Sequence, residues 1–204
     1  MGRTAGSTAA GTRERLLRAA ADVFARRGYD ATRVSDIATA AGLSNGAMYA
    51  HFGSKAALLV GALRAHGRRL LADLVSADPD RSIADVLLVT GRSLRRPRDP
   101  DGYLVIEALV AARRDADVAE PMRDYVAERV DWLAGLVAQA QARGEFDPAL
   151  PPRAVAHFCL ALGLGTALLT PDLNDVDDHE WATFLARLVA ALAPAPADGR
   201  EPPR

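Results

Sequence analysis

The chain of 204 residues is half hydrophobic and a quarter charged, an ordinary globular composition in a length sufficient for one sizeable core or two small domains. Its longest apolar run, residues 160–169, is far shorter than the roughly 20 residues of a membrane span, and the first residues lack the apolar stretch of a signal peptide, so we expect a cytoplasmic protein with no membrane partner. The formal charge of −1 conceals an asymmetry, because residues 1–72 hold 11 Lys and Arg against 4 Asp and Glu, which leaves +7 there and −8 in the rest.

The basic N-terminal third favours a polyanion as the partner of that part of the chain, although a solvated basic surface would have the same composition. The single cysteine, Cys159, excludes an intrachain disulfide. Its apolar surroundings favour a small buried hydrophobe over a reactive thiol.

Helical patterns run through the chain, while strand patterns are nearly absent, because β-branched residues are sparse and alternation is not sustained. The first predicted helix begins near Thr12 as its cap, carries an apolar face that includes Phe24, and ends at Gly28. A short helix over residues 33–41 follows, with Thr32 as its predicted cap and Gly42 as its end.

The stretch GLSNGAMYAHFGSK, residues 42–55, contains the most informative pattern. Ser44 is the predicted cap of a second short helix, in which Met48 and Phe52, four residues apart, face the core. Two short helices joined by a turn and preceded by a packing helix predict a helix-turn-helix unit, and helices this short need packing for stability. Gly46 lies near the start of the second short helix, where it costs about 1 kcal/mol against Ala. We interpret this glycine as a sign that something approaches the helix closely.

Further helices are predicted downstream, separated by clusters of Pro, Asp and Gly that are typical of turns. Their expected ranges are 58–75, 83–94, 103–114, 118–142, 153–169 and 179–192. The Pro-rich tail, residues 194–204, is predicted to be disordered. The predicted fold class is therefore all-α.

The N-terminal part of the chain resembles the TetR family of bacterial transcription regulators. The segments TRERLLRAAADVFARRGYDAT and DIATAAGLSNGAMYAHFGSKAALL, within residues 12–60, carry glycine, tyrosine, phenylalanine and lysine at the family spacing, and beyond residue 60 the resemblance is architectural only. The resemblance implies a homodimer, most often a repressor, that binds a palindromic double-stranded DNA operator and is released by a small-molecule effector. It divides the chain into a flexible arm (1–11), a helix-turn-helix DNA-binding domain (12–58), a ligand-binding and dimerisation domain (59–193) and the disordered tail (194–204).

Contacts to the DNA backbone are expected around the second short helix. Free N–H groups at a helix N-terminus favour an anion, and the missing Cβ of Gly46 lets a sugar-phosphate backbone come close. By resemblance, Tyr49 and His51 bind phosphates and Lys55 adds a charge beside them. Thr32 would contact the backbone from the opposite side of the groove. The alternatives are a half-buried packing aromatic for Tyr49, a capping or surface residue for His51 and a solvated charge for Lys55.

Base recognition is expected mainly from Asn45, which can pair bidentately with adenine. Ala47 and Ala50 stand where the family commonly has larger or polar side chains, although an alanine methyl can pack on a thymine methyl. The candidate DNA-binding residues are Thr32, Arg33, Ser35, Ser44, Asn45, Gly46, Ala47, Tyr49, His51 and Lys55. The two alanines keep open an alternative, a helical interaction protein with a degenerate helix-turn-helix that does not bind DNA.

A ligand cavity is expected among the helices that follow residue 58. Its candidate lining residues are Tyr103, Glu107, Met122, Tyr125, Trp132, Phe158 and Cys159. Glu107 lies in an apolar stretch, where a buried carboxylate needs a partner, and its alternative is an interhelical ion pair with Arg113 or Arg92. For the aromatic residues the alternative is a place in the core.

Dimerisation is expected through the last two helices, which pair with their copies in this family. Ala161 and Gly165 share one face and let helices approach closely, while Phe184, Leu188 and Leu192 supply apolar area. An enzyme is not predicted, because the four histidines lack metal-ligand spacing and no nucleophile lies beside a base. No cofactor and no metal are expected.

Overall fold

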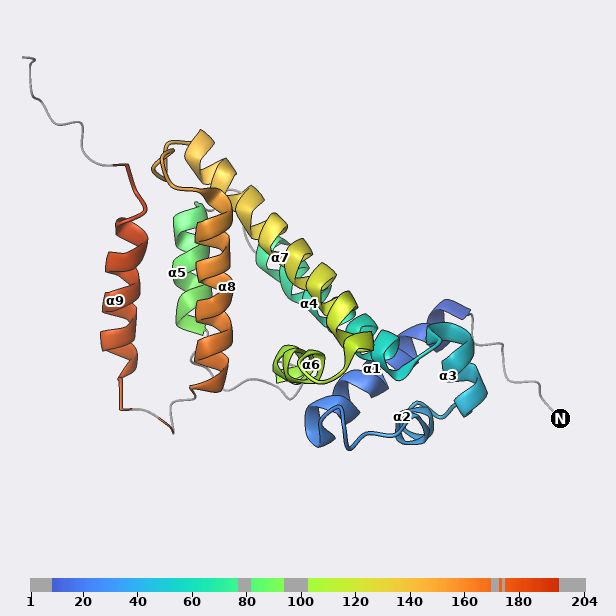
Figure 1. Cartoon of the computed structure of the whole chain (residues 1–204). Helices are drawn as coiled ribbons and strands as arrows, with labels where there is room; N and C mark the ends of the chain where they lie inside the picture. The colour runs from blue at the N-terminus through green and yellow to red at the C-terminus, as the bar shows by residue number, and fades with distance from the viewer. Residues whose placement is uncertain (1–8, 77–81, 94–102, 170–172, 174, 195–204) are drawn as a thin grey trace, which may run out of the picture. The chain divides into compact units, whose positions relative to one another are not determined.

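The computed structural model describes residues 9–76, 82–93, 103–169, 173 and 175–194, with residues 67–76 described for their backbone alone. Within these residues the chain forms α-helices and no strand, which confirms the predicted all-α class (Figure 1). The helices are α1 (Ala9–Arg27), α2 (Val34–Ala40), α3 (Asn45–Phe52), α4 (Lys55–Ser76), α5 (Ile83–Ser93), α6 (Leu104–Ala112), α7 (Ala116–Ala142), α8 (Pro152–Leu168) and α9 (Asp178–Ala190).

The helices divide into two compact units. The first comprises Met1–Ser76 and Arg98–Val126, and the second comprises Ala77–Pro97 and Ala127–Arg204. The helices α1 to α4, α6 and the start of α7 therefore belong to the first unit. This grouping differs from a boundary at residue 58, because α6 and α7 contribute apolar residues to the same core as α1 and α4.

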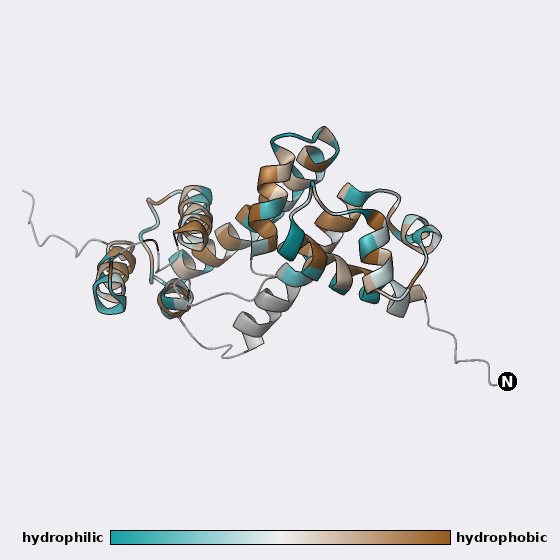
Figure 2. Ribbon diagram, turned by 90° about the horizontal axis from the view of Figure 1, so that it is seen from below, coloured by the Kyte–Doolittle hydropathy of each residue, from teal (hydrophilic) through white to brown (hydrophobic). Residues whose placement is uncertain are grey.

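The core of the first unit is built from regularly spaced apolar residues. Leu16, Ala20 and Phe24 of α1 lie four residues apart and are fully buried, the spacing of one helix face. Both hydrophobic and hydrophilic residues occur along the helices, as the brown and teal colours in Figure 2 show. The short helices α2 and α3, with 7 and 8 residues, contribute Ile37 and Met48 to this core. Packing thus stabilises helices that would be marginal alone.

Gly61 of α4 allows a close approach between α4 and its neighbours. A Cβ there would lie 3.1 Å from a ring atom of Phe52 and 3.2 Å from Leu17 Cδ2. These distances are tighter than ordinary van der Waals contact, so the glycine lets α3 pack close to α4 at this point.

Two predicted caps are wrong and one is confirmed. Residues 9–11 are already helical, so α1 begins before Thr12. The N-cap of α2 is Arg33, whose N–H donates to Asp36 Oδ2 at 3.0 Å, rather than Thr32. Ser44 caps α3 as predicted, because its hydroxyl accepts from the N–H of Ala47 at 3.2 Å.

The second unit has its own small core, formed by Ile83 of α5, Val137 and Ala140 of α7, and Phe146. Helix α9 packs closely on α5, where a Cβ at Gly91 would lie only 2.9 Å from Leu185 Cδ1. No helix within the described ranges is long and apolar enough to cross a membrane. The predicted disordered tail lies outside the described residues, apart from residue 194.

Candidate nucleic-acid interface

Helix α3 exposes one side to solvent and packs the other side on the core. Asn45, Gly46, Tyr49 and Ala50 are exposed, whereas Met48 is fully buried. The exposed residues are spaced one and four apart and therefore lie on one side of the helix. Because Met48 anchors the opposite side, the exposed residues are displayed in a defined orientation.

Gly46 has open space around it. A Cβ built at this residue would find only Ser44 Oγ within 4 Å, at 3.8 Å, so nothing described in the chain itself requires a glycine there. The close approach of a partner, which the sequence suggested for Gly46, stays a prediction.

Tyr49 and His51 follow along the same helix. The Tyr49 side chain is 52% exposed, which does not fit a half-buried packing aromatic. His51 is half-buried in the last turn of α3. Ala47 is half-buried and Ala50 is exposed. Because both side chains are single methyl groups, neither extends far from the surface of α3.

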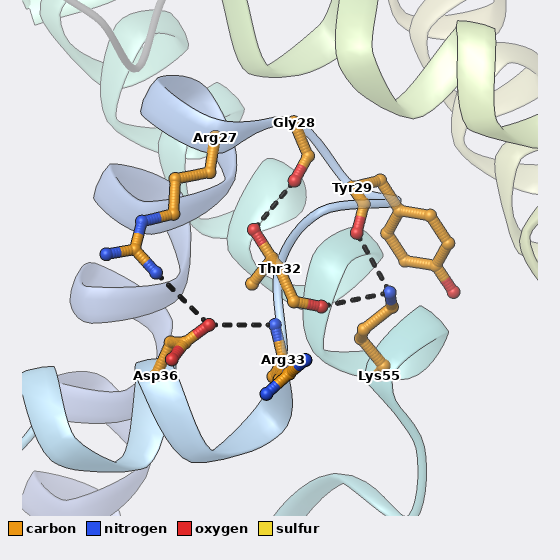
Figure 3. A network of polar contacts seen from close by, with 7 residues as sticks. All are labelled: Arg27, Gly28, Tyr29, Thr32, Arg33, Asp36 and Lys55. Carbon is orange, nitrogen blue, oxygen red and sulfur yellow. Dashed lines mark hydrogen bonds and ion pairs between the residues drawn. The ribbon is translucent and has the colours of Figure 1, made fainter.

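Lys55, the first residue of α4, points back into the protein (Figure 3). Its Nζ donates to the carbonyl oxygens of Tyr29 at 2.8 Å and Thr32 at 3.1 Å, and it lies 4.1 Å from the centroid of the Tyr29 ring. A lysine ammonium has three donors, so two of them hold the loop between α1 and α2. The main contacts of Lys55 are therefore inside the protein.

Thr32 is also turned inward. Its side chain is 2% exposed and its Oγ1 donates to the Gly28 carbonyl at 2.6 Å (Figure 3). The hydroxyl closes the same loop, and its burial leaves no exposed surface for the phosphate contact that the sequence predicted.

The start of α2 carries exposed polar residues. Arg33 and Ser35 are exposed, and the side chain of Asp36 accepts from the Arg33 N–H while forming an ion pair with Arg27 at 3.2 Å (Figure 3). The guanidinium of Arg33 is therefore displayed at the beginning of α2, on a backbone fixed by Asp36.

Two arginines of α1, Arg13 and Arg15, contact the helix-turn-helix. The sequence did not predict a role for either of them. Arg15 Nη2 donates to the carbonyl oxygens of Ala41 at 2.7 Å and Gly42 at 3.2 Å, which satisfies groups at the C-terminus of α2. The Arg13 guanidinium lies 4.9 Å from the centroid of the Phe52 ring. The only signal in the sequence was their position on the polar side of α1.

The candidate ligand-binding residues divide between the two units. Tyr103 and Glu107 are half-buried in the first unit, where Met122 and Tyr125 belong to the core. The second unit contains Trp132, whose ring lies 5.8 Å from the Arg129 guanidinium carbon, together with Phe158 and Cys159. Phe158 is 50% exposed, and burial raises the pKa of the Cys159 thiol.

The surroundings of Glu107 bear on its predicted ion pair, whereas its place in a ligand cavity stays a prediction. Among the described residues no ion pair joins it to Arg92 or to Arg113, which is exposed. Instead Glu107 Oε2 lies 3.1 Å from the position that a Cβ of Gly28 would occupy. The carboxylate thus faces the C-terminal end of α1.

The fold and the displayed face of α3 define a helix-turn-helix protein, and comparisons with known proteins identify the family. Residues 16–62 match the family described as bacterial regulatory proteins, tetR family, and residues 80–192 match the tetracyclin repressor-like C-terminal domain. The chain belongs to the TetR family and is a DNA-binding transcriptional regulator, not an enzyme.

Curated relatives and solved structures agree with this assignment. The transcriptional regulator UidR of Escherichia coli K12 is 26% identical over 181 residues, covering 89% of this chain and 91% of that protein. The repressor Rv3405c of Mycobacterium tuberculosis H37Rv is 38% identical over 160 residues, covering 78% and 73%. A TetR-family regulator from Rhodococcus sp. aligns with a TM-score of 0.77 at 25% identity over 89% of this chain and 98% of that one. Salmonella enterica GusR aligns with a TM-score of 0.72 at 25% identity, covering 89% and 95%.

Proposed function

We propose that the protein is a cytoplasmic repressor that binds a palindromic operator as a homodimer and is released by a small-molecule effector. The observation that carries the DNA-binding part is the exposed face of α3, where Gly46 has no neighbour among the described residues that would exclude a side chain. A gel shift with the DNA that flanks its own gene tests binding, and footprinting on the shifted fragment tests the palindrome.

Different residues of the interface position the protein on the DNA backbone and read the bases. Phosphates are contacted by Tyr49, His51 and the α3 N-terminus, while Asn45 and Arg33 read base edges. Lys55 and Thr32 are left out of the contact set, because their polar atoms are engaged with the α1–α2 loop.

The role of Asn45 is tested by Asn45→Ala. Loss of a bidentate base contact costs about 1 to 3 kcal/mol on the cognate operator and leaves binding to a scrambled duplex unchanged. Tyr49→Phe is the control, since it removes a phosphate contact and weakens both duplexes by similar factors. If Asn45→Ala weakens both duplexes equally, Asn45 does not read bases, and specificity comes from Arg33, Ser35 or DNA shape.

The homodimer is supported by apolar side chains that the chain itself leaves uncovered on α8 and α9. Phe158 and Leu168 of α8 are 50% and 56% exposed, and Phe184 of α9 is 56% exposed. Exposed aromatic and aliphatic residues of this size are typical of a surface that a partner covers, and a second copy brings the same helices.

The effector is proposed from the family and from structures of the same fold that contain ligands. A regulator from Saccharomonospora viridis was crystallised with choline, and FadR from Bacillus subtilis with stearoyl-CoA. Such different molecules do not identify the effector of this chain. Mass spectrometry of co-purified small molecules would identify it.

Effector and operator are expected to weaken each other's binding, because coupling between two sites is reciprocal and typically amounts to about 1 to 3 kcal/mol. The molecule found by mass spectrometry is titrated with and without operator. Equal affinities in the two titrations would contradict release by that molecule.

A further inference from the structure

The turn between α6 and α7 is joined to the DNA-binding helices through Asp115. One carboxylate oxygen, Oδ1, accepts from the N–H of Asp117 at 2.9 Å, and the Asp115 carbonyl accepts from the N–H groups of Val118 and Ala119. These bonds make Asp115 the residue that caps α7. The second oxygen, Oδ2, accepts a hydrogen bond from the phenol of Tyr29 at 3.0 Å.

Tyr29 lies in the loop between α1 and α2, residues 28–33, and contacts three other residues: Phe24, Lys55 and Asp115. Its side chain is 6% exposed and packs beside Phe24, with ring centroids 5.8 Å apart. Its carbonyl accepts from Lys55 Nζ, whose charge also faces the ring (Figure 3). Tyr29 thus joins the start of α7 to the start of α4.

The surroundings of Tyr29 favour the protonated phenol, which is the form that donates a hydrogen bond. Burial, the hydrogen bond to Asp115 and the negative charge of that carboxylate together raise the pKa of Tyr29 far above its ordinary value. A bond from a buried phenol to a charged acceptor is stronger than a neutral bond in water.

The same loop, residues 28–33, leads directly into α2 and so determines where α2 begins. It begins with Gly28, whose φ of +75° favours glycine, and ends at Arg33, the N-cap of α2. Lys55 also binds the Thr32 carbonyl one residue before that cap. Because α3 follows α2 directly and leads into α4, the loop and Lys55 hold both ends of the helix-turn-helix.

We infer that Tyr29 and Asp115 are positioning residues for DNA binding, which fix the loop 28–33 and through it the orientation of α2 and α3. Asp115 lies outside the residues 16–62 that match the DNA-binding part of the family. Asp115 belongs instead to residues 80–192, which match the C-terminal domain of the family, yet it lies in the same compact unit as the helix-turn-helix. The consequence for operator affinity rests on the proposed function, whereas the ordering of α2 and α3 does not.

The test compares two single variants, their combination and one control. Tyr29→Phe removes only the hydroxyl. Asp115→Ser keeps a good N-cap for α7 but is too short to reach Tyr29. Arg114→Gln is the control, because its ion pair with Asp30 at 3.4 Å joins two side chains that are each 70% exposed and contributes little.

Amide hydrogen exchange without DNA is the first measurement. Tyr29→Phe and Asp115→Ser should speed exchange in α2 and α3 by about 2- to 10-fold, with α5 and α9 of the second unit unchanged as internal reference. The double variant should exchange no faster than either single variant, because both remove the same bond. Unchanged exchange in α2 and α3, or an equal increase in α5 and α9, overturns the inference.

The second measurement is the affinity for the DNA that flanks the protein's own gene. It is made across a salt series, well below the melting temperature. Both variants should lose about 2- to 10-fold in affinity with the salt slope of the wild type, since no phosphate contact is removed. Full affinity in both variants overturns the role in DNA binding. If the wild-type protein does not bind DNA, the proposed function fails, and the exchange measurement alone decides whether the pair orders α2 and α3.

Discussion

Gly46 is expected to have opposite effects on folding and on DNA binding. An alanine Cβ fits at this position, with its nearest neighbour at 3.8 Å, and Ala in a helix is more stable than Gly by up to about 1 kcal/mol. We therefore expect Gly46→Ala to raise the free energy of unfolding in urea. The same methyl group would hold a DNA backbone away from α3, so operator affinity should fall in an anisotropy titration.

The matched control is Gly135→Ala, because Gly135 is a helical glycine of α7 that also has nothing within 4 Å of an added Cβ. It should raise stability without changing DNA affinity. Equal affinities of Gly46→Ala and wild type would show that no backbone approaches α3 at Gly46.

Lys55 is expected to act on DNA binding through the fold. In Lys55→Met the carbonyl groups of Tyr29 and Thr32 lose their donor, which should lower the free energy of unfolding by about 1 to 3 kcal/mol. The slope of log affinity against log salt should stay that of the wild type, because the ammonium is turned toward the loop. Arg33→Gln provides the comparison: Arg33 is exposed, and removing its positive charge from the DNA interface would lower the slope by up to about 0.9 per subunit, because fewer counterions are released from the DNA. A similar decrease in Lys55→Met would restore the phosphate contact that the sequence predicted.

The helices themselves could be predicted closely from the sequence, whereas the polar contacts between them could not. The expected range 83–94 corresponds to α5 (Ile83–Ser93), and 118–142 to α7 (Ala116–Ala142), because apolar periodicity and Pro or Gly clusters are local signals. The Ser44 cap is local in the same way. Lys55 and Asp115 act on residues 23 to 86 positions away, and no local pattern encodes such contacts.

The turn of the helix-turn-helix depends on α1 as well as on its own sequence. Arg15 bonds the carbonyl oxygens of Ala41 and Gly42 at the end of α2, where carbonyls lack intrahelical partners. We expect Arg15→Ala to lower the free energy of unfolding by about 1 to 2 kcal/mol. Arg18→Ala is the control on the same helix: it removes an exposed i, i+4 ion pair with Glu14 and should change stability by less than about 0.5 kcal/mol. Equal effects of the two variants in urea denaturation would show that the turn is held without Arg15.

At the scale of the whole molecule, the division into units follows burial rather than sequence motifs. The helix-turn-helix pattern ends near residue 60, yet Leu104, Ala108 and Met122 share one core with α1 and α4. The recognisable motif is therefore shorter than the unit that folds around it. Dimerisation, by contrast, is expected from the second unit, where apolar side chains of α8 and α9 remain exposed.

Gly165→Trp is the variant that tests this expectation. Gly165 lies in α8 with nothing within 4 Å of an added Cβ, so a side chain can start at this position without a clash at its first atom, whereas an indole would displace a copy packed closely against this face. We expect monomers at micromolar concentration in sedimentation velocity and weak operator binding, because half-sites about one helical turn of DNA apart need two recognition helices. Gly135→Trp adds the same ring at another open helical glycine of the second unit and should remain dimeric. Wild-type protein that sediments as a monomer with full operator affinity would contradict the homodimer. A Gly165→Trp variant that stays dimeric would place the interface elsewhere.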